Sequence, residues 1–145
     1  MTKAVYMILV TLMQLSGDVD KTRIIASTIY GECADQVASD DCKCAVASVI
    51  WKAADKPING ISLANECAKP GRYCCWLKDH IEIDISSQAW CDCKLLAREM
   101  VSGVFEPSID ADFFLSGSGA PPHEWGAVEY VETIGGLRFW RKGKP

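Results

Sequence analysis

Helical and strand patterns occupy separate parts of this chain, and that order limits the folds it can adopt. Apolar residues recur at helical spacing in the first two thirds, where helices are expected at residues 5–15, 24–32, 42–54 and 87–102. After Pro107 the pattern changes to strands, expected at residues 113–115, 127–134 and 137–140. The last two flank a Gly-Gly pair that is typical of a two-residue hairpin. This order predicts an α+β fold, mainly helical, with a small C-terminal antiparallel hairpin sheet.

Local signals indicate where these segments begin and end. Asp40-Asp41 is expected to cap the third helix and Ser86-Ser87 the fourth, which ends near Gly103. Residues 61–84 follow a break in the helical pattern and are expected to be rich in loops. Within them, the turn at residues 69–73 leads into aromatic side chains that are expected to be exposed.

The size and charge of the chain favour one acidic domain. Its 145 residues are enough for one core, and no repeat or internal boundary divides residues 18–145. The net charge of −4 gives no reason to expect a nucleic-acid partner. The basic tail Arg138–Lys144 is expected to be a solvated terminus, and the protein is expected to be a monomer.

The N-terminal residues 1–17 allow two interpretations. Lys3 precedes an apolar run at residues 4–13, which has the shape of the hydrophobic part of an export signal. A first helix packed into the core explains the run equally well. The run is too short for an ordinary transmembrane helix, so no stable membrane span is expected.

Eight cysteines in 145 residues indicate covalent or metal cross-links. Their even number and density favour disulfide bonds formed in an oxidising compartment. The pairing cannot be deduced from the sequence, because eight cysteines permit 105 connectivities. A second interpretation is a tetrahedral structural zinc ion bound by two Cys-x-Cys pairs: Cys42, Cys44, Cys91 and Cys93. A third is that the cysteines are reduced thiols in the core.

One carboxylate is predicted on the apolar side of a helix. Ile25, Ile29 and Glu32 are spaced i, i+4 and i+7, so they share a face. A carboxylate among apolar side chains loses hydration, which raises its pKa and keeps it protonated, ready to act as a general acid. Gly31 beside it leaves room for a bulky substrate. The alternative is that Glu32 lies at a fraying helix end and reaches water.

Seven short segments carry patterns that follow one another in a specific order. These are a hydrophobic run ending in Tyr-Gly-Glu at residues 25–33, an Ala-Val-Ala-x-Val-Ile helix at 45–50, a proline-containing turn at 69–73, a helix ending in glycine at 96–103, a strand at 109–115, a Pro-x-x-Trp loop at 122–125 and a closing strand at 134–140. The series resembles the SleB-type cell wall hydrolases, a family of spore cortex-lytic enzymes and phage lysins. The resemblance covers residues 22–141. The chain departs from the family at Leu137, where the family has histidine, and at Phe113 and Phe114, where some members have tyrosine.

The resemblance implies a fold, a reaction and a catalytic residue. In the family the glutamate of the opening motif is the catalytic acid, and Glu32 stands at that position. The expected architecture is lysozyme- or transglycosylase-like, and the expected substrate is the glycan strand of peptidoglycan, cleaved between N-acetylmuramic acid and N-acetylglucosamine. Because no second acid is obvious, a lytic transglycosylase with Glu32 as general acid and then general base is expected, without a cofactor. The expected location is the periplasm, the cell wall or the extracellular space, or the host cytoplasm before release if the protein is a phage lysin.

Sugar binding requires aromatic faces and hydrogen-bonding edges. Candidates in turns and loops are Tyr73, Trp76, Phe113, Phe114, His123 and Trp125. Phe113 and Phe114 fit equally well as strand core residues, and His123 as a surface histidine. If the reaction were hydrolysis, a second carboxylate would be needed. The candidates for it are Asp35, Glu66, Glu106 and Asp110.

Two functions of other classes fit the same sequence. The first is a cysteine-stapled module that binds cell wall glycan or a protein without cleaving it. The second is a small interaction domain stabilised by zinc at the two Cys-x-Cys pairs.

Overall fold

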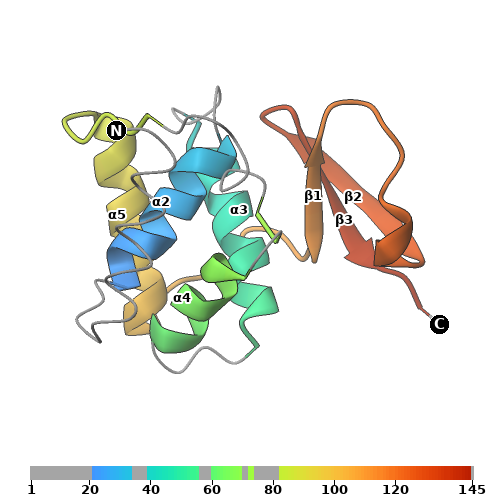
Figure 1. Cartoon of the computed structure of the whole chain (residues 1–145), viewed down its shortest axis with the longest axis horizontal. Helices are drawn as coiled ribbons and strands as arrows, with labels where there is room; N and C mark the ends of the chain where they lie inside the picture. The colour runs from blue at the N-terminus through green and yellow to red at the C-terminus, as the bar shows by residue number, and fades with distance from the viewer. Residues whose placement is uncertain (1–20, 34–38, 56–59, 70–71, 74–81, 145) are drawn as a thin grey trace.

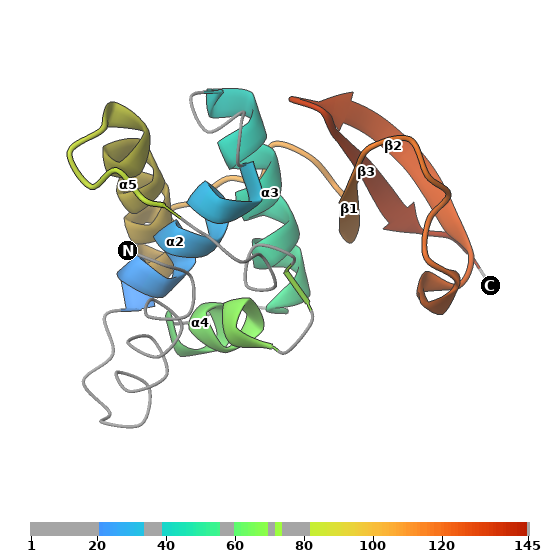
Figure 2. The same ribbon diagram turned by 45° about the horizontal axis from the view of Figure 1, so that its top comes forward.

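A helical body and a small sheet lie side by side in the computed structural model of this chain (Figures 1 and 2). The structure describes residues 21–33, 39–55, 60–69, 72–73 and 82–144. The helices are α2 (Lys21–Cys33), α3 (Asp40–Ala53), α4 (Gly60–Ala68) and α5 (Gln88–Ser102). The strands are β1 (Phe113–Ser116), β2 (Val128–Ile134) and β3 (Leu137–Lys142), with a short 3-10 helix, η3 (His123–Trp125), between β1 and β2. The predicted α+β fold, mainly helical with a small antiparallel sheet, is confirmed. The expected N-terminal helix or export signal lies outside the described residues.

Helix α2 is the centre of the helical body. It packs against α3, α4 and α5, and most of its side chains are buried. Ser27 and Thr28 are buried polar residues whose hydroxyls donate to the carbonyl oxygens of Arg23 and Ile24, at 2.6 and 3.0 Å. These bonds satisfy the hydroxyls inside the helix itself, so α2 can be surrounded by other helices without leaving them unpaired.

A serine side chain caps each of the helices α3 and α5, although the residue that caps α3 is not the one expected. The side chain of Ser39, and not Asp40 or Asp41, caps α3 by accepting a hydrogen bond from the Cys42 amide at 3.2 Å. The two aspartates lie in the first turn, where their charge is favourable to the helix dipole. Ser87 caps α5 as predicted, and the helix ends at Gly103, whose φ of 82° is the left-handed conformation that glycine adopts readily.

Helix α4 corrects the expectation of loops from residue 61 onward. Residues 60–68 form a helix of 9 residues, with Leu63, Ala64 and Cys67 buried against the rest of the body. The first residue of this helix is Gly60. A Cβ at this position would lie 2.8 Å from the Lys21 side chain and 3.1 Å from that of Val101. The start of α4 therefore lies so close to α2 and α5 that a larger residue there would require the Lys21 and Val101 side chains to shift.

The three strands form an antiparallel sheet in the order β1-β3-β2. Gly135 and Gly136, at φ 55° and 79°, make the predicted two-residue turn between β2 and β3. Alternate residues Leu137 and Phe139 of β3 are buried, so one face of the sheet packs against the core. Helix α3 contacts both β1 and β2 and is the helix nearest the sheet in Figure 1.

No helix in the part of the chain that the structure describes is long and apolar enough to cross a membrane.

Candidate functional site

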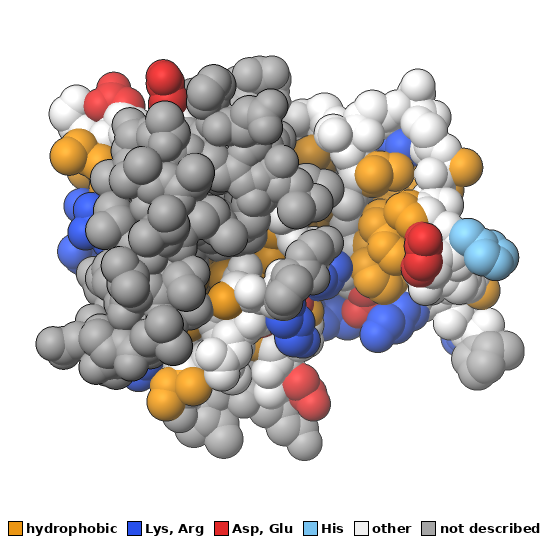
Figure 3. Space-filling view, in the orientation of Figure 1, with side chains coloured by type: hydrophobic (Ala, Val, Ile, Leu, Met, Phe, Trp, Pro, Cys, Tyr) orange, Lys and Arg blue, Asp and Glu red, His pale blue; other side chains and the backbone are white. Residues whose placement is uncertain are grey.

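An open cavity of about 800 Å³ lies where the sheet meets the helical body. We call it the aromatic groove and define it by the lining residues Lys52, Glu66, Lys69, Arg72, Phe113 and Trp125. The lining also includes Ala53, Asp55, Asp112, Phe114, Leu115, Pro122 and Lys142. Its walls come from the end of α3, the end of α4 and strand β1. In Figure 3, hydrophobic side chains over the sheet lie next to Lys and Arg side chains on this face of the molecule.

Two stacked aromatic rings form one side of the groove. The rings of Phe113 and Trp125 have centroids 4.5 Å apart and an interplanar angle of 10°, and both side chains are half-buried. The Arg72 guanidinium lies 5.4 Å from the Phe113 centroid, close enough for a cation–π interaction. The groove thus combines a flat apolar surface with a positively charged hydrogen-bond donor.

Glu66 holds two basic residues of the groove, Lys69 and Arg72, in place. Its carboxylate is only 2% exposed, accepts a hydrogen bond from Arg72 Nε at 2.9 Å and pairs with Lys69 Nζ at 2.7 Å. The Tyr73 hydroxyl donates to the same carboxylate at 3.2 Å. Burial opposes ionisation, but the hydrogen bonds and charges of Lys69 and Arg72 outweigh it, so the pKa of Glu66 is lowered. Glu66 is therefore an ionised positioning group rather than a proton donor at neutral pH.

Glu32 lies in the helical body, in the last turn of α2, as the sequence predicts. It is 7% exposed, on a helix whose Ile25 and Ile29 are fully buried. The sulfur of Cys67, on α4, is within electrostatic range of both Glu32 and Glu66. Burial raises the pKa of Cys67 to about 12, and the charges of Glu66 and Glu32 contribute in the same direction. The alternative that Glu32 simply reaches water at a fraying end does not fit its burial.

The aromatic candidates fall into separate environments. Phe113 and Trp125 line the groove, and Phe114 lines it as well while packing against Phe139 in the core, with centroids 5.7 Å apart. Tyr73 is 1% exposed, so the expectation of an exposed ring at this position is wrong. It is buried because its ring lies against Phe114 while its hydroxyl reaches Glu66.

The last two aromatic candidates are His123 and Trp76. His123 is exposed, at the start of η3, as its surface interpretation predicts. Trp76 lies outside the described residues.

The second-acid candidates are likewise dispersed. Glu66 is the one that lines the groove, whereas Glu106 is exposed. Asp110 is also exposed and pairs with Lys52 at 2.6 Å and with Arg141 at 3.5 Å. Asp35 lies outside the described residues.

Sequence reasoning missed the roles of Lys52, Lys69 and Arg72 in the groove. The turn at residues 69–73 is a local signal for this region, but the contacts of Lys52 with Asp110 and Asp112 and of Arg72 with Phe113 join residues that are distant in the chain.

The proposed zinc ligands do not form a metal site. Cys42 and Cys93 are buried, Cys44 is half-buried and Cys91 is exposed. Within the described ranges, no group of three or more His, Cys, Asp or Glu residues could hold a metal ion. The cysteines are therefore better considered as thiols or disulfide partners.

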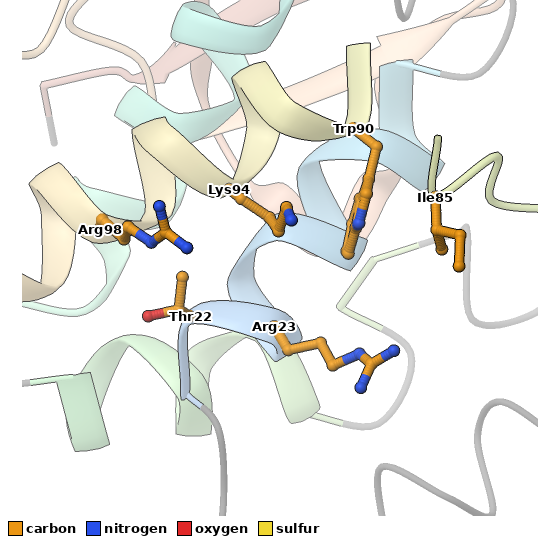
Figure 4. A pocket seen from close by; sticks show the side chains of 6 residues that line it. All are labelled: Thr22, Arg23, Ile85, Trp90, Lys94 and Arg98. Carbon is orange, nitrogen blue, oxygen red and sulfur yellow. The ribbon is translucent and has the colours of Figure 1, made fainter. Parts of the chain in front are cut away.

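A second cavity, of about 410 Å³, has a positive lining (Figure 4). Thr22 and Arg23 come from α2, Trp90, Lys94 and Arg98 from α5, and Ile85 from the segment before α5. The Lys94 ammonium lies 5.9 Å from the Trp90 ring centroid. Among the residues that the structure describes, this lining holds three cations and no acidic side chain, which suits an anionic group better than a neutral one.

No family model matches this chain, and neither the curated proteins nor the solved structures contain a match.

Proposed function

We propose that this protein cleaves the glycan strands of peptidoglycan between N-acetylmuramic acid and N-acetylglucosamine. The observation that carries the proposal is the buried carboxylate of Glu32, 7% exposed in the last turn of a helix whose Ile25 and Ile29 are fully buried. Burial disfavours the charged form of a carboxylic acid, and the negative end of the helix dipole acts in the same direction. A carboxylic acid that keeps its proton can donate it to a leaving oxygen, and we assign that role to Glu32. The resemblance to the SleB-type hydrolases selects the same residue.

The reaction needs one acid if it proceeds as a lytic transglycosylation. Glu32 protonates the glycosidic oxygen, and the bond from that oxygen to C1 of the muramic acid breaks. The carboxylate of Glu32 then accepts the proton of the C6 hydroxyl of the same sugar, and O6 bonds to C1. This closes a 1,6-anhydro ring and returns the proton to Glu32 without an attacking water.

The aromatic groove supplies a surface on which a glycan can bind. Stacked rings such as Phe113 and Trp125 offer an apolar face to the C–H side of a sugar ring. Arg72 and Lys69 can bind the carboxylates that muramic acid and its peptide carry. Glu66 contributes by orienting these two cations, because its lowered pKa keeps it ionised.

The proposal is tested by incubating purified peptidoglycan with the protein and with Glu32→Gln, and measuring the soluble fragments. The substitution keeps the shape of the side chain but cannot cycle a proton, so fragment release is expected to fall at least about 100-fold. Glu106→Gln is the matched control, since it removes an exposed carboxylate, and release is expected to stay unchanged. Equal release by the protein and Glu32→Gln would contradict the assignment of Glu32.

A second candidate function is glycan binding without cleavage. It is favoured by the groove itself, whose described lining contains the aromatic pair but not Glu32. The two functions are distinguished by measuring binding and release with the same peptidoglycan. Binding by the folded protein with no release of fragments would support the binding module and overturn the enzyme.

A further inference from the structure

Two buried cysteines meet at the junction of α2 and α3. Cys33 is the last residue of α2 and Cys42 lies in the first turns of α3. Their Sγ atoms are 3.1 Å apart, and the two side chains are 3% and 0% exposed. We propose that Cys33 and Cys42 form a disulfide bond that ties the end of α2 to the beginning of α3.

The geometry requires only a small movement. A disulfide bond has an S–S distance of about 2.05 Å, so the two sulfurs must approach by about 1 Å. Both thiols already point at each other from the ends of separate helices, and a small change in side-chain torsion supplies that distance.

Among the cysteines that the structure describes, the surroundings distinguish this pair from other pairs; Cys44 is half-buried, and Cys74 and Cys75 lie outside the described residues. Cys91 is exposed on α5, and the sulfur of Cys67 interacts with Thr28 on α2. Cys93 is buried within electrostatic range of both Cys33 and Cys42, which makes it the main competitor. Cys42 is nevertheless the partner whose sulfur is in contact with that of Cys33.

The two thiols also differ in pKa, and this difference decides which of them is the nucleophile. The hydrogen bond between the two thiols and the positive charge of Lys43 lower the pKa of Cys42, against the effect of burial. The same hydrogen bond and burial raise the pKa of Cys33. Cys42 is therefore the thiol that reacts first, because the thiolate is the nucleophile.

The oxidant is a low-molecular-weight disulfide such as oxidised glutathione. The Cys42 thiolate attacks one sulfur of that disulfide and releases one glutathione thiolate. The Cys33 thiol then loses its proton and attacks the Cys42 sulfur of the mixed disulfide, which releases the second glutathione. The two protein thiols lose two electrons in total, and one disulfide is reduced to two thiols. Because both sulfurs are buried in the folded protein, we expect the exchange to occur late in folding, when the ends of α2 and α3 have met but the sulfurs are still open to the oxidant.

The test uses the full chain and does not depend on the proposed enzymatic function. The reduced, unfolded protein is refolded with oxidised and reduced glutathione, and remaining thiols are alkylated under denaturing conditions. It is then digested with trypsin without reduction. Cleavage after Arg23 and Lys43 releases residues 24–43, a peptide whose cysteines are Cys33 and Cys42 alone. Most of this peptide is expected without alkyl groups and about 2 Da lighter than the dithiol form, as an internal disulfide requires.

Three results would overturn the proposal. They are alkylation of both cysteines in residues 24–43, a cross-link from this peptide to residues 44–52 or 79–94, and a cross-link to residues 53–72 or 73–78, which contain Cys67, Cys74 and Cys75. Cys91→Ser is the matched control, and it should leave the light peptide unchanged.

A second measurement compares the melting temperatures of the parent protein and of the variant Cys33→Ser, before and after reduction. Reduction of the refolded parent protein should lower its melting temperature by about 5–10 °C, because the bond restricts the unfolded chain. The same treatment should lower the melting temperature of Cys33→Ser by clearly less. An equal decrease in both proteins would contradict a bond at Cys33.

Discussion

The substitution Glu66→Gln removes one negative charge from the base of the aromatic groove while keeping the size of the side chain. The Glu66–Lys69 pair contributes about 0–1 kcal/mol, because the Lys69 side chain is 61% exposed. The hydrogen bond from Arg72, whose side chain is 22% exposed, contributes about 1.5–3 kcal/mol. Tyr73 can still donate to the amide oxygen of glutamine. The free energy of unfolding at neutral pH is therefore expected to fall by about 2–3 kcal/mol, below the 3–5 kcal/mol typical of a fully buried pair.

The effect of Glu66→Gln also has a predicted pH dependence. The pKa of Glu66 in the folded protein is lowered below its ordinary value of 4.5 by Lys69 and Arg72, despite burial. Its contribution is therefore fully present above about pH 4.5 and is lost as the pH falls through the folded pKa. The difference in stability between the parent protein and the variant should be large at pH 7 and clearly smaller near pH 3.

Urea denaturation followed by circular dichroism measures both parts of this prediction. Glu106→Gln serves as the control for removing an exposed carboxylate, and it should change the free energy of unfolding by less than about 0.5 kcal/mol. A variant Glu66→Gln as stable as the parent at neutral pH would refute the reasoning. So would a loss of stability that is the same at both pH values.

Three further predictions concern other parts of the structure. Burial lowers the pKa of Lys43, but the hydrogen bonds and charges of its two aspartate partners raise it, and the net effect is an increase. The contribution of Lys43 to stability should therefore be lost above about pH 10.5. In that range the urea midpoint of the parent protein should fall more steeply with pH than that of Lys43→Met. Phe139→Ala removes a fully buried ring from β3 and should lower the free energy of unfolding by about 3–5 kcal/mol in the same assay; a loss below about 1 kcal/mol would mean that the sheet does not depend on this contact. Trp125→Leu removes the stacking partner of Phe113, so calorimetric titration with a soluble peptidoglycan fragment should show at least about 5-fold weaker binding. The free energy of unfolding should fall by about 0.5–1.5 kcal/mol. Unchanged affinity would mean that the glycan binds elsewhere.

The parts of the fold that depend on local signals could be predicted from the sequence. Helix α5 has a serine cap and a terminal glycine, and the Gly135-Gly136 turn needs only two residues in the left-handed conformation. Helix α4 was not predicted, because it has 9 residues and begins at a glycine. Its start depends on a close approach to α2 and α5, which no local pattern encodes.

The candidate site shows the same division between local and long-range information. The burial of Glu32 follows from helical spacing, so it could be predicted. The burial of Tyr73 depends on Phe114 from the sheet and on Glu66 from α4, which are brought together only by folding. The pairing of Cys33 with Cys42 likewise depends on how two helices meet, and a count of cysteines cannot provide it.

The central claim is that Glu32 cleaves a glycan by cycling one proton, and the mass of the products tests it most directly. Purified peptidoglycan is digested with the parent protein and with Glu32→Gln, and the fragments are identified by mass spectrometry. The account predicts 1,6-anhydro-muropeptides from the parent protein and none above background from the variant. Fragments with ordinary reducing ends, or no fragments from a protein shown to be folded, would contradict it.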